Sequence, residues 1–221
     1  MIQLQQIQEK LPDNSYLFYC FEAMMELKKS LDWVCFHVED MDDDDIQVYE
    51  RNFIISLTTM LSKNGFTLSG LINGEVAKSL DAFAPIEIKN KYLTLKRSLK
   101  QDYAPKSCYV FPDFLIHESH SSKKDSWTVN NQHIIIEAKT NYITNKKAFF
   151  LDLFKLNAYL SYLHFENAIY LIVQTPISKI NEYLLEYMQQ VEFLSDRISN
   201  LYFFIQERID DEPKIYKIQI D

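Results

Sequence analysis

The chain has 221 residues, of which 47% are hydrophobic and 14% aromatic, enough for one sizeable α/β domain and too many for wholesale disorder. Its three cysteines are far apart and include no C-x-x-C, which excludes a disulfide framework and a zinc cluster. The three glycines, Gly65, Gly70 and Gly74, fit neither a P-loop nor a dinucleotide-binding fingerprint. No apolar run approaches the ~20 residues of a membrane helix and no secretory signal is evident, so we expect a cytoplasmic protein without membrane contact.

The net charge of −8 argues against a nucleic-acid partner, but the charge is unevenly distributed. Residues 86–155 hold 12 Lys and Arg against 7 Asp and Glu, so the remainder of the chain has a net charge of −13. A local positive surface matters more to a polyanion than the overall sum. The basic segment therefore keeps a nucleic-acid partner open, and chance clustering of surface lysines is the alternative.

The N-terminal half gives a mixed pattern. Apolar spacing predicts a helix over 14–33 and a second over 46–63, ended by Asn64-Gly65. Residues 34–38 favour a short strand. Between 66 and 106 the pattern is ambiguous: 66–72 and 86–97 alternate like strands, while 74–83 favours a short helix.

The C-terminal half has a sharper pattern. The expected elements are a strand over 108–119 interrupted at Pro112, a polar loop over 119–132, a strand over 133–140, a helix over 145–164, a strand over 167–175, a helix over 178–197, and strands over 201–208 and 214–220. This alternation predicts an α/β fold with a mixed central β-sheet flanked by helices. We expect residues 1–45 to form an N-terminal helical extension packed on a main domain of 46–221.

The stretch "HIIIEAKT" (133–140) ends a buried strand with an acid and an amine on one face, because side chains two apart in a strand point the same way. Asp113 follows Pro112 at the head of another apolar strand, and antiparallel pairing would bring it near Glu137 and Lys139. Adjacent carboxylates repel unless a proton or a cation lies between them. Mg²⁺ takes one or two carboxylates and keeps several waters, and the Ala138 carbonyl is a further ligand of the right kind. With Lys139 beside it, such a site suits phosphodiester hydrolysis.

Pro112-Asp113 followed by Glu137-Ala138-Lys139 resembles the PD-(D/E)XK nuclease superfamily, which has a restriction-endonuclease-like fold. The resemblance implies an α-β-β-β-α-β core over roughly 46–175, Asp113 and Glu137 as ligands of Mg²⁺ or Mn²⁺, and Lys139 as the catalytic lysine. The family often adds an acid from its first helix, for which Glu50 is the candidate, with Asp45 and Glu39 as alternatives.

The helix after the motif also resembles the family. Its "KLNAYL" places Lys155 and Tyr159 on one helical face, where a RecB-like branch has Gln-x-x-x-Tyr facing the nucleic acid. Lys stands here in place of Gln. Together with Lys146 and Lys147, these residues are the candidates for contacting substrate.

Other metal patterns are less well supported. The acidic run at 40–45 fails as an EF-hand, because Asp45 occupies the glycine position and Arg51 the glutamate position. His37 is an alternative ligand by analogy with nucleases that place a histidine before the acids, although a core histidine is the commoner case. His117 and His120 are interpreted as loop histidines.

The sequence thus predicts a divalent-metal-dependent nuclease, with DNA favoured over RNA and endonuclease over exonuclease action, in restriction, repair or mobile-element defence. A homodimer or an accessory protein partner would suit double-strand cutting, and the Lys-, Asn-, Ile- and Tyr-rich composition suggests a bacterial or phage origin. The alternative is a catalytically inactive nuclease-fold subunit that binds nucleic acid or a protein partner. In a third reading E-A-K is a coincidence, and Asp113 and Glu137 would then lie more than ~10 Å apart.

Overall fold

The computed structural model describes residues 2–7, 11, 15–30, 50–63, 72–73, 78–81, 83–99, 108–117 and 132–220. Its helices are α1 (Tyr16–Ser30), α2 (Glu50–Lys63), α3 (Ile86–Leu99), α4 (Lys146–Tyr162) and α5 (Ile177–Gln190), with a 3-10 turn η4 (Ile198–Asn200). Its strands are β1 (Ile2–Gln6), β2 (Ile72–Asn73), β3 (Lys78–Ser79), β4 (Tyr109–Val110), β5 (Phe114–His117), β6 (Gln132–Lys139), β7 (Asn167–Val173), β8 (Leu201–Gln206) and β9 (Lys214–Ile220).

Within these ranges the strands form one seven-stranded sheet, in the order β1-β9-β8-β7-β6-β5-β2, and a two-stranded sheet of β3 and β4. Strand β5 runs antiparallel to both of its neighbours, β2 and β6. Strands β6, β7 and β8 are parallel, and β9 runs antiparallel to both β8 and β1. The α/β class and the mixed, helix-flanked sheet are therefore confirmed. The central strands are apolar on both faces because helices cover both.

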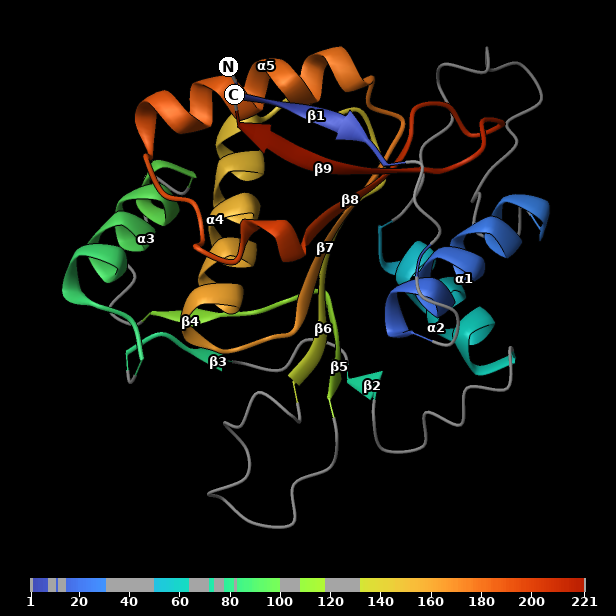
Figure 1. The fold of residues 1–221 in the computed structure, drawn as a ribbon, viewed down its shortest axis with the longest axis horizontal. Coiled ribbons are helices and arrows are strands. Elements are labelled where there is room, and N and C mark those ends of the chain that lie inside the picture. Colours follow the sequence, from blue (N-terminus) through green and yellow to red (C-terminus); the bar gives the residue numbers. More distant parts are fainter. Residues whose placement is uncertain are drawn as a thin grey trace.

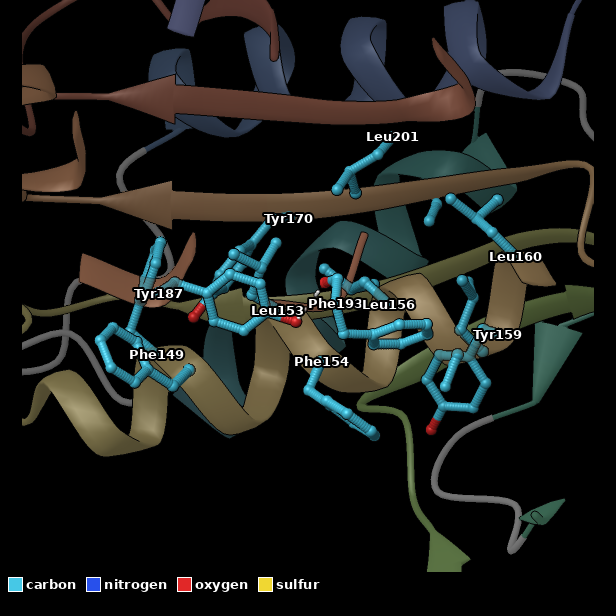
Figure 2. Close-up of a cluster of buried hydrophobic side chains, with 14 of the residues drawn as sticks. Phe149, Leu153, Phe154, Leu156, Tyr159, Leu160, Tyr170, Tyr187, Phe193 and Leu201 are labelled. Carbon is cyan, nitrogen blue, oxygen red and sulfur yellow. Dashed lines mark hydrogen bonds between the residues drawn. The ribbon is translucent and has the colours of Figure 1, made fainter. Parts of the chain in front are cut away.

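The sheet separates two hydrophobic cores. Figure 1 shows it nearly edge-on, with α3, α4 and α5 on one face and α1 and α2 on the other. The α4-side core includes Leu115 and Ile135, and the α1–α2 core includes Ile134, Ile136 and Ala138. Figure 2 shows part of the α4-side core, where aromatic and leucine side chains of α4 gather with Tyr170 of β7 and Tyr187 of α5. Because neighbours alternate along a strand, residues 137 and 139 of β6 face α4.

One expected strand is a helix. Residues 86–97 alternate apolar and charged side chains, yet they form α3. Ile88, Tyr92 and Leu95 are spaced four and three residues apart and pack on the α4-side core. The segment therefore has the apolar spacing of a helix as well as the alternation of a strand. Pro85 begins the helix by offering its carbonyl to the amides of Ile88 and Lys89.

Three other boundaries differ from the sequence prediction. The helix expected over 178–197 ends at Gln190, after which Glu192 adopts a positive φ of 51°. The short helix expected over 74–83 gives way at 78–79 to strand β3. The strand expected over 108–119 is divided into β4 and β5, because Pro112 has no amide hydrogen to pair within a sheet.

The N-terminal segment shares the sheet of the main domain. Strand β1, which the sequence did not predict, pairs with β9, and α1 packs against α2. The expected strand at 34–38, with His37, and the acids Glu39 and Asp45 lie outside the described residues, as does His120. Among the described helices none is both long and apolar enough to cross a membrane.

Candidate active site

The start of β5 brings Asp113 beside the end of β6. Phe114 pairs with Ile136 in the antiparallel register, so Asp113 lies level with Glu137. The Ala138 amide donates a hydrogen bond of 2.8 Å to Oδ2 of Asp113. The predicted meeting of Asp113 with the Glu137–Lys139 segment is therefore present, whereas a coincidental E-A-K motif gives no reason for it.

Lys139 contacts three acceptors from different elements. Its ammonium group lies 2.8 Å from the Ala138 carbonyl, 3.1 Å from Asp152 Oδ2 and 3.2 Å from Glu50 Oε2. Glu50 begins α2, which covers the opposite face of the sheet from α4, so its side chain reaches Lys139 at the end of β6. Glu50 and Lys139 stay partly exposed, and the site opens to solvent on their side.

Lys155 lies deeper in the site. Its ammonium group is 2.5 Å from Glu137 Oε2 and 2.9 Å from Asp152 Oδ1, and Glu137 is fully buried. Asp152 therefore bridges the two lysines, one with each carboxylate oxygen. Sequence reasoning missed Asp152, although a signal exists: it is an acid within the apolar run "FFLDLF", on the helical face that also carries Lys155.

Four carboxylates and two ammonium groups make up what we call the carboxylate–lysine cluster: Glu50, Asp113, Glu137, Asp152, Lys139 and Lys155. With every group ionised, the cluster carries two negative charges in excess. Within the described residues, Oε1 of Glu137 is also buried without a hydrogen-bond partner. An unpaired carboxylate oxygen beside excess negative charge suits a bound cation.

Burial dominates the electrostatics of the carboxylates. It raises the pKa of Glu137 well above the ordinary range, an effect that Lys155 opposes and that Asp152 and Asp113 reinforce. Burial likewise raises the pKa of Asp113 and of Glu50. Asp152 behaves differently: burial alone would raise its pKa, but the ion pairs with Lys155 and Lys139 lower it.

Both lysines are held in the charged form. Burial alone would lower the pKa of each, but the carboxylates outweigh it and raise the pKa of Lys139 and of Lys155. Asp152 acts most strongly on Lys139, and Glu137 on Lys155. The cluster therefore presents fixed positive charge next to carboxylates that gain from a further cation.

The oxygens that could hold a divalent ion are those of Asp113, Glu137 and the Ala138 carbonyl. Over the described ranges no three His, Cys, Asp or Glu side chains are arranged to hold a metal by themselves. Mg²⁺ needs fewer, since it commonly binds through one or two carboxylates and completes its shell with water. The donor types and the excess negative charge fit such an ion, which would share Glu137 with Lys155.

The residues expected to contact substrate fall into two groups. Tyr159 is fully buried, and the side chain of Lys155 is only 11% exposed. The Tyr159 hydroxyl has no hydrogen-bond partner among the described residues. At the start of α4, Lys146 is ion-paired with Glu186 at 2.6 Å, whereas Lys147 is exposed and reaches the Ser98 carbonyl at 3.3 Å. Substrate contact by all four stays a prediction. The side chain of Lys146 is 44% exposed and Lys147 is exposed, so these two are more accessible than Lys155 and Tyr159.

Comparison with known proteins adds no relative: no protein-family model, curated protein or solved structure matches the chain.

Proposed function

We propose that this chain is a divalent-metal-dependent phosphodiesterase of the PD-(D/E)XK type, an endonuclease acting on DNA. The observation that carries the proposal is the hydrogen bond from the Ala138 amide to Asp113, which joins the two halves of the motif at one end of the β5–β6 pair. Glu50 and Asp152 then complete a cluster around Lys139. A structural ion pair would need neither four carboxylates nor a buried oxygen without a partner.

The order of elements supports the proposal. From α2 the chain runs through β2, β5 and β6 to α4 and β7, which is the α-β-β-β-α-β order of the superfamily, with β3, α3 and β4 inserted after β2. The first three of these strands are antiparallel and β7 runs parallel to β6. The motif then falls on the second and third strands of the core, as in that superfamily.

Asp113, Glu137 and the Ala138 carbonyl would hold Mg²⁺ or Mn²⁺. When bound, the ion would polarise the scissile phosphate and lower the pKa of a water molecule. The carboxylates must be ionised to bind it, and their raised pKa values mean that they gain most from its charge.

Lys139 would act as a fixed positive charge. The surrounding carboxylates raise its pKa, so it is an ammonium group rather than a base in this arrangement. It can donate to a phosphate oxygen or orient the attacking water, and it offsets charge that develops in the transition state. Asp152 is a positioning residue, because it holds Lys139 and Lys155 at once.

A cleavage assay tests the proposal. Supercoiled plasmid, linear duplex, single-stranded DNA and RNA are incubated with Mg²⁺, Mn²⁺ or chelator, using the wild type and Lys139→Ala. We expect metal-dependent cutting that falls by roughly 100-fold or more in the variant, the typical effect of removing a preorganised transition-state donor. Lys217→Ala is the matched control, since that lysine lies over the Tyr202 ring away from the cluster. Cutting that survives chelator, or that Lys139→Ala leaves intact, would contradict the proposal.

One observation favours the alternative, a catalytically inactive subunit that binds nucleic acid or a protein partner. Lys155 occupies Oε2 of Glu137, an oxygen that a metal ion would otherwise use. DNA binding that is equal with metal and with chelator, and that leads to no cleavage, would support this alternative.

A further inference from the structure

Exposed aromatic side chains lie next to the carboxylate–lysine cluster. Seven large hydrophobic side chains are exposed in the described part of the chain: Ile55, Ile86, Tyr109, Phe111, Tyr142, Leu185 and Ile220. The three aromatic ones, Tyr109, Phe111 and Tyr142, are called here the exposed aromatic set. All three lie in segments that lead into or out of the site strands.

The chain itself keeps two members close to the site. Phe111 is two residues before Asp113, so their Cα atoms lie within ~7 Å, and Tyr142 is three residues after Lys139, within ~11 Å. The other aromatic side chains of the described residues are half-buried or, like Phe149 and Tyr170, fully buried. Among the described residues, the exposed aromatic rings therefore lie in segments adjoining the strands of the proposed site.

The segment that carries Tyr109 and Phe111 is anchored. Val110 is buried between them, so both rings stand on the solvent side of the strand. The Tyr92 hydroxyl donates to the Tyr109 carbonyl at 2.7 Å, and the Lys155 ammonium lies 3.5 Å from the Phe111 carbonyl. The backbone beneath the rings is therefore tied to the same lysine that contacts Glu137.

Positive charge lies beside the aromatic set. The Lys96 ammonium sits 5.3 Å from the centre of the Tyr92 ring, whose hydroxyl holds Tyr109. Arg97 is exposed next to it, and Lys147 reaches the end of the same helix through the Ser98 carbonyl. This arrangement of cations and exposed rings is the pattern of surfaces that track a phosphate backbone while bases stack on aromatic side chains.

We propose that Phe111, together with Tyr109 and Tyr142, stacks unpaired bases, so that the substrate is single-stranded or locally unpaired DNA. In a duplex the faces of the bases are covered by their neighbours, and exposed rings could reach them only after extrusion of a base. Stacking accepts every base, so this surface favours strandedness over sequence. The inference rests on the proposed nuclease function, whose substrate it specifies.

Binding measured by fluorescence polarisation in chelator, where metal-dependent cleavage does not occur, tests the inference. The probes are a labelled 16-nucleotide single strand and the same sequence in a duplex. We expect Phe111→Ala to weaken single-strand binding roughly 5- to 100-fold, as loss of one stacked base does, and to change duplex binding by less than about 2-fold. Phe111→Trp should retain affinity. Leu185→Ala is the control, because its side chain is 46% exposed against 48% for Phe111 and lies on α5.

An abasic site in the single strand distinguishes a loss of affinity caused by lost stacking from a loss with another cause. Where Phe111 stacks a base, removing that base should cost the wild type about as much as Phe111→Ala does, and removing both should cost little more. Fully additive losses at every position of the strand would overturn the inference.

The outcomes distinguish the two proposals. If the wild type cuts duplex and single strand equally and Phe111→Ala changes neither, stacking is wrong and the nuclease proposal stands. If single strands bind through Phe111 but no metal supports cutting, stacking stands and catalysis is wrong. A wild type that neither binds nor cuts any DNA would overturn both.

Discussion

The two faces of β6 carry different kinds of side chain. Toward α1 and α2 the strand presents Ile134, Ile136 and Ala138, and the α1–α2 core around them is apolar. Toward α4 it presents Ile135, then Glu137 and Lys139, which meet charged residues of α4. Over residues 134–139, one strand therefore carries an apolar face and a face with buried charge. The first face contributes to the hydrophobic core, and the second carries the cluster to which we assign the proposed chemistry.

Removing Lys155, which forms the most buried ion pair of the cluster, should have the largest effect on the free energy of unfolding. Lys155→Met leaves Glu137 and Asp152 without their buried partner, and we expect it to lower the free energy of unfolding by about 3–5 kcal/mol. Adding Glu137→Gln should recover part of the loss, because no unpaired charge then remains beside Met. Chemical denaturation measures both, with exposed Lys147→Met as the control, for which we expect less than about 0.5 kcal/mol. Equal losses in Lys155→Met and the double variant would show that the pair is not coupled.

A cavity in the α1–α2 core should lower the free energy of unfolding nearly as much, without changing the rate of cleavage. Met24 of α1 is fully buried, and we expect Met24→Ala to cost about 2–5 kcal/mol. Metal-dependent cleavage per folded molecule should stay within about 2-fold of the wild type. A large loss of activity at a temperature where the variant is folded would mean that the two faces are not separable.

Asp152→Asn should affect activity more than stability. Asn keeps the shape but loses the charge that most strongly raises the pKa of Lys139. Residues that orient a site in this way typically contribute 10- to 100-fold, so we expect cleavage to fall by about that factor. Because Lys139 would then lose its proton at lower pH, the alkaline limit of the pH–rate profile should move down. The control is Asp196→Asn, at an exposed aspartate. If Asp152→Asn leaves the alkaline limit unchanged, Asp152 contributes to packing only.

Asp113→Asn should give the smallest change in stability, and it should stabilise the metal-free protein. Burial raises the pKa of Asp113 above its unfolded value, so ionising it disfavours the folded state at pH above the raised pKa, and the penalty disappears below the unfolded pKa. The variant should therefore melt at a higher temperature than the wild type at pH 8, and at the same temperature near pH 3, below the unfolded pKa. Thermal unfolding in chelator measures this, and a gain of equal size at both pH values would contradict the electrostatic cause.

The sequence predicts those features that depend on local pattern. The apolar runs that form β6 and β7 predict buried strands, and the structure has strands there. Pro112 marks where β5 begins. The approach of Asp113 to Glu137 then follows from the short antiparallel pair of β5 and β6. Features that depend on distant packing are not predicted. Asp152 matters only because α4 lies across β6, and β1 finds its partner at the other end of the chain. In α3, charged residues alternate with apolar ones, a pattern typical of a strand. The helical spacing of its apolar residues becomes evident only from which of them pack on the α4-side core.

The pairing of β1 with β9 has a consequence for biosynthesis. Ile2 pairs with Ile220, so β1 must wait until β9, later in the chain, has been synthesised. At 5–20 residues per second that interval is roughly 10–40 s. Asn181 of α5, whose side-chain oxygen accepts the Leu4 amide at 2.7 Å, is synthesised well before β9 and can hold β1 in the meantime. The residues of the carboxylate–lysine cluster are all synthesised before that closing strand, so the site can assemble while the sheet is still incomplete.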